Sequence, residues 1–321
     1  MKRFGATIFA FMMLVTLISG CRQTAPMPDG KISIVCTIFP QYDWVRQILG
    51  DNVGDMELTL LLHNSVDLHS YQPTVDDIIS ITTCDLIVFV GGESDKWVSD
   101  ALKSANNPDT IIVNLLETLG NTAKIEEIQE GMDEGDATDD DGPEYDEHVW
   151  LSLRNAEIFC SAITDALISL DVENAADYEK NLAAYIAEIS ALDARYGAAI
   201  NAASNKTLLF GDRFPFRYLL DDYGLSYYAA FPGCSAETEA SFQTIIFLAK
   251  KADELNLDTI VVTESADQSI AISIINNTEA GNQQILVLDA MQSVTSGDLQ
   301  NGVTYLSIME SNLNILKDAI T

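Results

Sequence analysis

One long stretch of helical periodicity divides this sequence. Between residues 177 and 203 apolar side chains recur in steps of three and four, the spacing of one face of an α-helix. About 25 residues of helix extend roughly 40 Å, enough to cross a molecule made of two lobes. Short apolar strands alternate with amphipathic helices on both sides of this stretch. That order predicts an α/β fold: two α/β lobes with mainly parallel sheets, joined by one long linking helix.

The alternation sets the expected boundaries. We expect a first lobe over residues 31–173, the linking helix over 174–204 and a second lobe over 205–321. The apolar run at 86–90 is typical of a parallel strand buried on both faces. Strands are predicted at 31–38, 56–62, 86–90, 111–113, 207–210, 226–231, 259–263 and 285–288. Helices are predicted at 42–49, 74–81, 216–223, 237–255, 268–276 and 304–319. Because ligands bind beyond the carboxyl ends of such strands, two facing lobes predict one cleft.

The N-terminus indicates export. Lys2 and Arg3 precede an apolar run at 4–18 that is short for a membrane span. The run ends in LISGC at 17–21, which looks like the cleavage box of a bacterial lipoprotein. Residues 1–21 are then a signal peptide, Cys21 is the lipidated first residue, and 22–30 are a tether. We expect a protein anchored to the cell membrane on its extracytoplasmic face. An ordinary signal peptide with a chance cysteine is the alternative.

The charge excludes some partners. The chain has 49 acidic and 17 basic residues and a formal net charge of -32. Such a surface repels nucleic acid and attracts cations, so we expect no nucleic-acid partner. Residues 126–147 contain twelve acids and neither Lys nor Arg. They predict a mobile, solvated loop that does not pack.

The cysteines other than Cys21 are widely spaced. They are Cys36, Cys84, Cys160 and Cys234, and no pair has C-x-x-C spacing, so a zinc ribbon is not indicated. An exported protein can form disulfides. Their apolar neighbours favour buried thiols instead.

Histidine is scarce, which makes its contexts informative. The chain has three, at His63, His69 and His148. His69 lies in a loop between a predicted strand and a capped helix, and His148 lies where the acidic stretch meets a helix. We interpret His63 as structural and the other two as candidate ligands.

Several motifs together resemble one family, the substrate-binding proteins of zinc and manganese ABC importers. The segment HSYQP at 69–73 resembles that family's H-x-Y-x-P element, and DEHVWL at 146–151 resembles its second histidine element. The match follows the family's order over nearly the whole mature chain. Its other elements are Phe39-Pro40, Gly91-Gly92-Glu93 with Trp97, Phe216 and Tyr218 with YGL at 223–225, Leu288-Asp289, and Tyr305 with Asn312.

The resemblance implies a non-enzymatic, monomeric binding protein that clamps one divalent ion between two lobes. The cargo is zinc or manganese, and the partner is the permease of an ABC importer. The metal ligands carried over are His69, His148 and Asp289. Imidazole nitrogens and a carboxylate suit zinc and also manganese.

The sequence departs from the family pattern at Arg213. The family's third ligand falls on this residue, and a guanidinium has no lone pair to donate. Asp212, Glu264 or Cys234 are candidate replacements. Alternatively Arg213 pairs with Asp289 or Glu264 and orients that carboxylate, or it holds an anion in the cleft.

The sequence is also compared with other classes of function. A metallohydrolase is unsupported, because H-E-x-x-H, G-x-S-x-G and a glycine-rich phosphate loop are all missing from the sequence. A binding protein for an anionic metal chelate or a tetrapyrrole has Arg213 in its favour. An additional role as a surface adhesin is compatible with the sequence.

Overall fold

The computed structural model describes residues 30–63, 66–133, 144–235 and 239–320. Contacts divide the chain into Met1–Lys31 and Ile32–Thr321, and the second unit contains all the strands and helices below. The predicted signal peptide, Cys21 and most of the tether lie outside the described residues. Within the described residues no helix is both long enough and apolar enough to cross a membrane.

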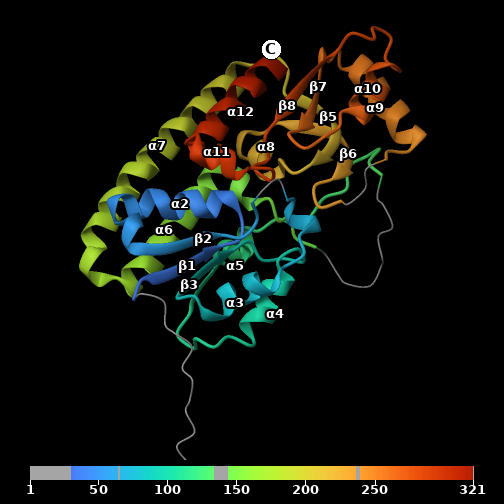
Figure 1. Cartoon of the computed structure of the whole chain (residues 1–321). Helices are drawn as coiled ribbons and strands as arrows, with labels where there is room; N and C mark the ends of the chain where they lie inside the picture. The colour runs from blue at the N-terminus through green and yellow to red at the C-terminus, as the bar shows by residue number, and fades with distance from the viewer. Residues whose placement is uncertain (1–29, 64–65, 134–143, 236–238, 321) are drawn as a thin grey trace, which may run out of the picture. The chain divides into compact units, whose positions relative to one another are not determined.

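The first lobe is built on a parallel sheet in the order β2-β1-β3-β4 (Figure 1). All residues of β3 are buried, as the apolar run at 86–90 predicts. Its strands are β1 (Ile32–Cys36), β2 (Met56–Leu60), β3 (Leu86–Phe89) and β4 (Ile111–Asn114). Its helices are α2 (Phe39–Leu49), α3 (Val75–Thr83), α4 (Lys96–Leu102), α5 (Leu115–Leu119) and α6 (Leu153–Leu170), with short 3-10 turns η1 (Gly50–Asp55), η2 (Leu68–Ser70), η3 (Gly120–Thr122), η4 (Val149–Leu151) and η5 (Val172–Asn174).

The second lobe repeats this topology, with the parallel order β6-β5-β7-β8. The register of β5 against β6 shifts between Phe210 and Arg213, so Gly211 and Asp212 form an irregularity in the strand. Its strands are β5 (Thr207–Phe214), β6 (Ser226–Pro232), β7 (Thr259–Thr263) and β8 (Gln284–Leu288). Its helices are α8 (Arg217–Tyr223), α9 (Phe242–Glu254), α10 (Ser269–Ile275), α11 (Ser296–Gln300) and α12 (Tyr305–Ala319).

The linking helix α7 (Ala175–Ala202) has 28 residues, about 42 Å of helix. It packs against α2 and α6 of the first lobe and against α12 of the second, as Figure 1 shows. Six of the positions predicted from periodicity form its buried face: Tyr178, Tyr185, Ile189, Leu192, Tyr196 and Ile200. The fold class predicted from the sequence is therefore confirmed.

Contacts besides α7 also join the lobes. The Tyr305 backbone N–H donates to Asp43 Oδ2 at 2.9 Å, and the Tyr305 hydroxyl donates to Trp150 O at 2.8 Å. The Trp150 indole N–H in turn donates to Ala290 O at 2.9 Å. These groups are buried, so the bonds between the lobes are shielded from water. The largest apolar cluster accordingly includes side chains of both lobes.

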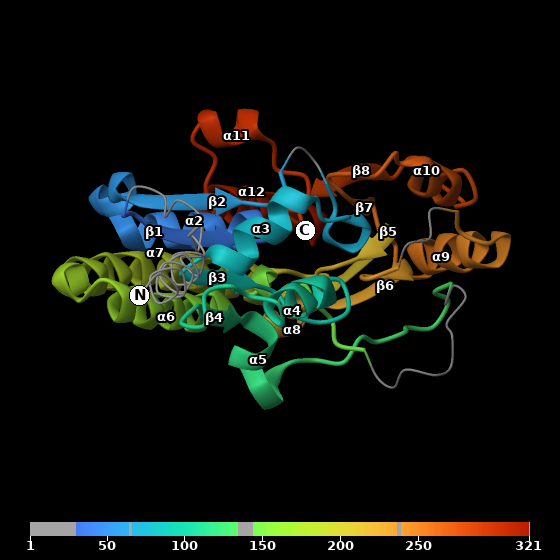
Figure 2. The same cartoon turned by 60° about the horizontal axis from the view of Figure 1, so that its bottom comes forward.

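The acidic stretch differs from the expectation of a loop that does not pack. Ile125 forms an antiparallel bridge with Tyr145, and Asp133 N donates to Ala230 O of β6 at 2.9 Å. Figure 2 shows this segment running from α5 towards β6 and α9. The described parts of the segment are a loop, as predicted, but the expectation that the loop does not pack is wrong. Backbone hydrogen bonds and the Arg217–Glu127 ion pair at 3.2 Å hold residues 126–133 and 144–147. Residues 134–143 lie outside the described residues.

Local capping corrects one helix boundary. Helix α9 begins at Phe242 rather than at residue 237, because the Ser241 side chain accepts the Thr244 N–H and caps the helix there. The cysteine interpretation holds for Cys36, Cys84 and Cys160, which are buried free thiols. Cys234 is a free thiol as well, but it is only partly buried.

The buried face of α7 makes a stability prediction. Ile189→Ala should destabilise the metal-free protein by about 2–5 kcal/mol, because it removes apolar contacts and leaves a cavity. The neighbouring exposed Glu188→Ala should change stability by no more than about 0.5 kcal/mol. Urea unfolding followed by circular dichroism measures both. Equal effects of the two variants would contradict the assignment of this face.

Candidate metal centre

His69 lies in the turn η2, just after the first sheet's β2 segment. The Asp67 side chain caps this turn by accepting the His69 backbone N–H at 2.9 Å. The imidazole Nδ1 lies 2.8 Å from Ser94 Oγ and 3.7 Å from Glu147 Oε2. The ring is thus held by polar groups from three separate segments of the first lobe.

The turn at Gly91-Gly92 places Ser94 beside this ring. Both glycines have positive φ, 88° and 82°, which side-chain-bearing residues rarely adopt. A Cβ at Gly92 would lie 2.3 Å from Glu147 Oε1, so the backbone passes too close to that carboxylate for a side chain. Glu147 Oε1 accepts the Ser94 N–H at 2.9 Å, while Glu147 Oε2 is buried without a hydrogen-bond partner. This unpaired oxygen faces His69 Nδ1.

His148 is completely buried and immediately precedes η4. Asp146 Oδ1 accepts its backbone N–H at 2.9 Å and lies 3.0 Å from its Nδ1. A carboxylate at Nδ1 favours the tautomer with the proton on that atom, which leaves the Nε2 lone pair free. Gly233 packs against the ring, since a Cβ there would lie 3.0 Å from His148 Cε1.

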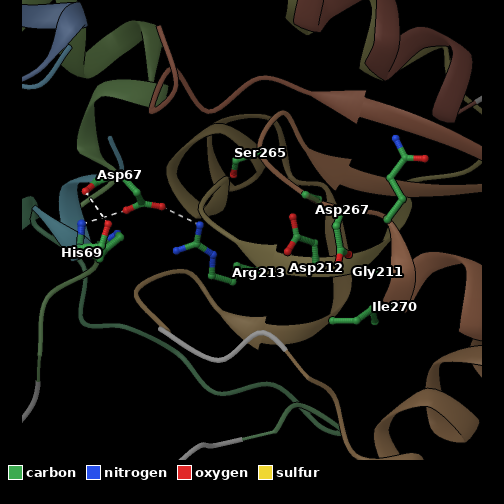
Figure 3. Close-up of a pocket in the computed structure, with 11 residues that line it drawn as sticks. Asp67, His69, Gly211, Asp212, Arg213, Ser265, Asp267 and Ile270 are labelled. Atoms are coloured by element: carbon green, nitrogen blue, oxygen red, sulfur yellow. Dashed lines mark hydrogen bonds and ion pairs between the residues drawn. The ribbon is translucent and has the colours of Figure 1, made fainter. Parts of the chain in front are cut away.

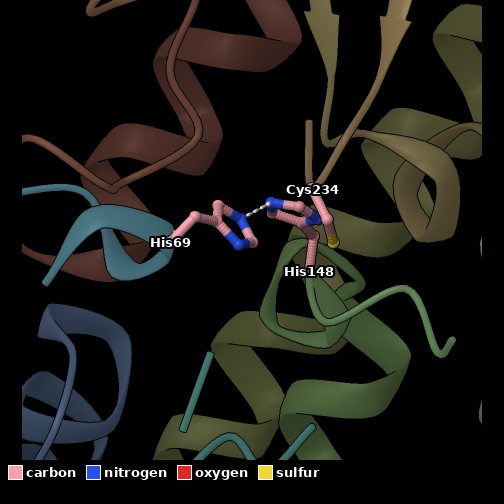
Figure 4. Close-up of side chains that lie close together, drawn as sticks. All are labelled: His69, His148 and Cys234. Carbon is pink, nitrogen blue, oxygen red and sulfur yellow. Dashed lines mark hydrogen bonds between the residues drawn. The ribbon is translucent and has the colours of Figure 1, made fainter. Parts of the chain in front are cut away.

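The two imidazoles face each other through their Nε2 atoms, 3.1 Å apart (Figure 4). Two nitrogen ligands of a tetrahedral zinc ion, at about 2.0–2.1 Å from the metal, lie about 3.3 Å apart. The pair is therefore already near the separation that a zinc ion requires. Burial, and then the neighbouring His148, lowers the pKa of His69 to about 3, so this ring is neutral at physiological pH.

Cys234 of the second lobe completes a group of three. One potential ligand atom from each of His69, His148 and Cys234 lies within 4.8 Å of the other two. Among the described residues, no other group of three or more His, Cys, Asp or Glu side chains has its potential ligand atoms this close together. His63 is outside it: this exposed side chain donates from Nδ1 to Leu61 O at 2.8 Å.

The carboxylates expected from the sequence as ligands lie outside this group. Asp289 Oδ1 accepts the Met291 N–H at 2.7 Å, and burial, then Glu264, raises the Asp289 pKa to about 7. Glu264 accepts the N–H groups of Ala290 and Gln292 at 2.8 and 2.9 Å. Asp212 Oδ2 accepts the Thr263 N–H at 3.0 Å. Each carboxylate is thus engaged with backbone amides of the second lobe.

Arg213 pairs across the cleft rather than within its own lobe. Its Nη2 lies 2.6 Å from Asp67 Oδ2, in a partly buried ion pair. The prediction that it pairs with Asp289 or Glu264 is therefore wrong: those carboxylates accept backbone N–H groups, whereas Asp67 faces the guanidinium from the first lobe. Because Asp67 neutralises Arg213, the free positive charge that favoured an anionic ligand is lost.

A pocket of about 380 Å³ opens beside this ion pair (Figure 3). Asp67, His69 and Ser70 line it from the first lobe, and Asp212, Arg213 and Asp267 are among the lining residues of the second. The cleft predicted between two facing lobes is present, and His69 lies at its edge.

Known proteins share this sequence pattern and this fold. The family described as "Zinc-uptake complex component A periplasmic" matches residues 34–319. The high-affinity zinc uptake system protein ZnuA of Bacillus subtilis is 29% identical over 99% of this chain and 98% of its own length. The zinc-binding lipoprotein AdcA of Streptococcus pneumoniae is 30% identical over 90% of this chain, which spans only 56% of AdcA.

Solved structures agree with these matches. The metal-dependent lipoprotein YcdH of Bacillus subtilis superposes with a TM-score of 0.73 at 28% identity, covering 91% of this chain and 100% of that one. The Zn(II)-bound ZnuA-like domain of Streptococcus pneumoniae AdcA gives a TM-score of 0.70 at 27% identity, covering 91% and 99%.

The Asp146–His148 contact generates a prediction. Asp146→Asn should weaken zinc binding by about 10- to 100-fold, because a neutral amide holds the ligating tautomer of His148 less firmly than a carboxylate does. Competition titration against a zinc chelator measures the affinity. The matched control is Glu144→Gln, an exposed acid of the same segment, which should bind zinc like the wild type. Equal affinity of the Asp146 variant and the control would refute this role.

Proposed function

This chain belongs to the family of periplasmic component A proteins of zinc-uptake complexes, and we propose that it captures one zinc ion between its lobes for an ABC importer. Members of this family are substrate-binding proteins, so the sequence-based prediction of a binding protein rather than an enzyme is confirmed. The metal is the transported cargo, held by side chains that release it unchanged.

The observation that carries this proposal is the opposed pair of Nε2 atoms of His69 and His148, 3.1 Å apart. In the absence of metal one Nε2–H donates to the other. Since Asp146 favours the Nδ1–H form of His148, His69 is the donor. A cation replaces that single proton, and His69 then carries its proton on Nδ1, where Ser94 Oγ and Glu147 Oε2 accept it.

The donor set favours zinc over manganese. Imidazole nitrogens suit zinc, whereas manganese prefers a site richer in oxygen. Relatives at 29% and 30% identity are named for zinc uptake and zinc binding. Asp289 remains our candidate for a carboxylate ligand from the second lobe, with Glu264 and Asp212 as less direct candidates. Manganese transport is the alternative that a metal competition experiment addresses.

The acidity of the chain supports capture. A net charge of -32 produces a negative potential that raises the local concentration of cations and speeds their association. The two histidines lie where the acidic segment ends, so an attracted ion is led towards them. We propose that delivery then occurs to a membrane permease.

Lipid anchoring is also part of the proposal. The LISGC sequence at 17–21 supports it, and the relative AdcA is named a lipoprotein. An anchor would keep the protein at the extracytoplasmic membrane surface, close to its permease.

The imidazole pair can be tested directly. We expect purified wild-type protein to hold about one zinc ion per chain. The double variant His69→Ala, His148→Ala should lose this zinc and the thermal stabilisation that zinc provides, about 2.7 kcal/mol at a free concentration 100 times Kd. Elemental analysis and melting curves with and without zinc are the measurements.

The control for this experiment is His63→Ala, which removes the exposed histidine and should retain zinc. Full zinc content in the double variant would sink the proposed site. Stronger retention of manganese than zinc by the wild type would overturn the choice of cargo.

The lipid anchor makes a separate prediction. In a bacterial host, labelled palmitate should be incorporated into the wild type, and the protein should fractionate with membranes. Cys21→Ala should abolish both, because it removes the only sulfur at the cleavage box. Cys234→Ser, which removes a thiol elsewhere, should leave both unchanged. A labelled Cys21→Ala variant would contradict the anchor.

A further inference from the structure

We propose that Cys234 is a metal ligand: its sulfur joins the imidazoles of His69 and His148 in the cleft, so the site selects thiophilic divalent cations. This inference rests on the proposed function and extends it to the metal's contact with the second lobe. It predicts that zinc and cadmium bind and that manganese is rejected, because soft sulfur ligands favour the former.

Geometry is the first argument. The three potential ligand atoms lie within 4.8 Å of one another, and they come from three segments far apart in the sequence (Figure 4). On a tetrahedral zinc ion, with Zn–S about 2.3 Å and Zn–N about 2.0–2.1 Å, sulfur and nitrogen lie about 3.6 Å apart. The remaining gap is therefore at most about 1.2 Å, and a small shift of the second lobe or a rotation of the cysteine side chain closes it.

The turn that carries Cys234 is held against the metal centre. The Cys234 backbone N–H donates to Glu126 Oε1 at 2.8 Å, and Gly233 packs on the His148 ring. On the other side Arg213 Nη1 donates to Ser235 O at 3.4 Å. The turn is therefore fixed on both sides of the cysteine, which limits the freedom that metal binding must remove.

Arg213 acts as a positioning residue in this arrangement. Its guanidinium contacts Ser235, next to Cys234, and Asp67, which caps the turn of His69. The Arg213 guanidinium cannot bind a metal ion itself. It contacts the backbone segments of two proposed ligands, His69 in the first lobe and Cys234 in the second. This explains how an arginine can sit beside a cation site, since the Asp67 carboxylate offsets its charge.

The surroundings of Cys234 differ from those of the other described cysteines. Cys36, Cys84 and Cys160 are fully buried in the apolar core of the first lobe. Cys234 is only partly buried and lies among acidic residues. The desolvation of its thiol, and then the charges of Glu126 and Asp146, raise the pKa of that thiol well above the usual value. The metal-free thiol is protonated. Metal binding breaks the S–H bond, forms the metal–sulfur bond and releases the proton to solvent.

Cobalt(II) reports the sulfur directly. The full chain, with Cys21→Ser so that this thiol cannot contribute, is loaded with cobalt(II) in place of zinc. We expect near-ultraviolet thiolate-to-cobalt charge-transfer absorption, which zinc should abolish by displacement. Cys234→Ser should lose this band and bind zinc more than about 100-fold less tightly. Removing a residue that only supports a ligand typically lowers the affinity by about 10- to 100-fold, so a larger loss indicates a direct ligand.

Two further variants complete the design. Cys84→Ser is the matched control: Cys84 Sγ donates to Ile81 O, and a serine hydroxyl can donate likewise, so the band and the affinity should persist. Cys234→His supplies a nitrogen ligand at the same position. It should retain zinc without the charge-transfer band, which separates loss of a ligand from loss of the fold.

The outcomes distinguish the two levels of proposal. A cobalt complex of the wild type without charge-transfer absorption, or unchanged zinc affinity in Cys234→Ser, overturns the role of Cys234 and leaves the proposed function standing. Failure of the wild type to bind either zinc or cobalt overturns the proposed function itself.

Discussion

Two buried imidazoles that meet at their Nε2 atoms define the centre of this molecule. Burial lowers the pKa of His69 to about 3, so the His69 ring stays uncharged near neutral pH and does not repel its neighbour. Each Nδ1 faces its own acceptor group, Asp146 for His148 and Ser94 with Glu147 for His69. The two Nε2 atoms converge on one point. We propose that a cation binds at this point.

The fold places this point by joining two similar sheets through several buried contacts. Helix α7 packs on both lobes, and the buried bonds of Tyr305 and Trp150 connect them nearer to the cleft. The Asp67–Arg213 ion pair bridges the two lobes beside the pocket that His69 lines. A partly buried pair of this kind contributes modestly to stability. Its main consequence is geometric, because it sets the position of the second-lobe turn at Cys234 relative to the first-lobe histidines.

Much of the architecture follows from the sequence because its signals are local. The steps of three and four from Tyr178 to Ile200 form the buried face of α7, and the continuous apolar run at 86–90 forms a fully buried strand. The sequence pattern places the start of α9 too early because the Ser241 cap outweighs the helical pattern upstream of it. Net charge does not predict the packing of the acidic segment because it does not reveal backbone hydrogen bonds such as Asp133 N to Ala230 O.

The site was less accessible to sequence reasoning. His69 and His148 could be selected from their motifs, but the partner of Arg213 could not, because Asp67 lies 146 positions away and meets it only across the cleft. Cys234 offered one weak signal, a thiol beside Gly233 after an apolar strand. Its approach to His148 depends on how β6 ends in the second lobe.

Anomalous diffraction at the zinc edge from crystals of the zinc-loaded protein tests the proposed zinc site most directly. We expect one peak per chain, at bonding distance from Nε2 of both His69 and His148, with density connecting it to a side chain of the second lobe. A zinc peak elsewhere, for example on the acidic segment, with the two imidazoles still bonded to each other, would contradict it.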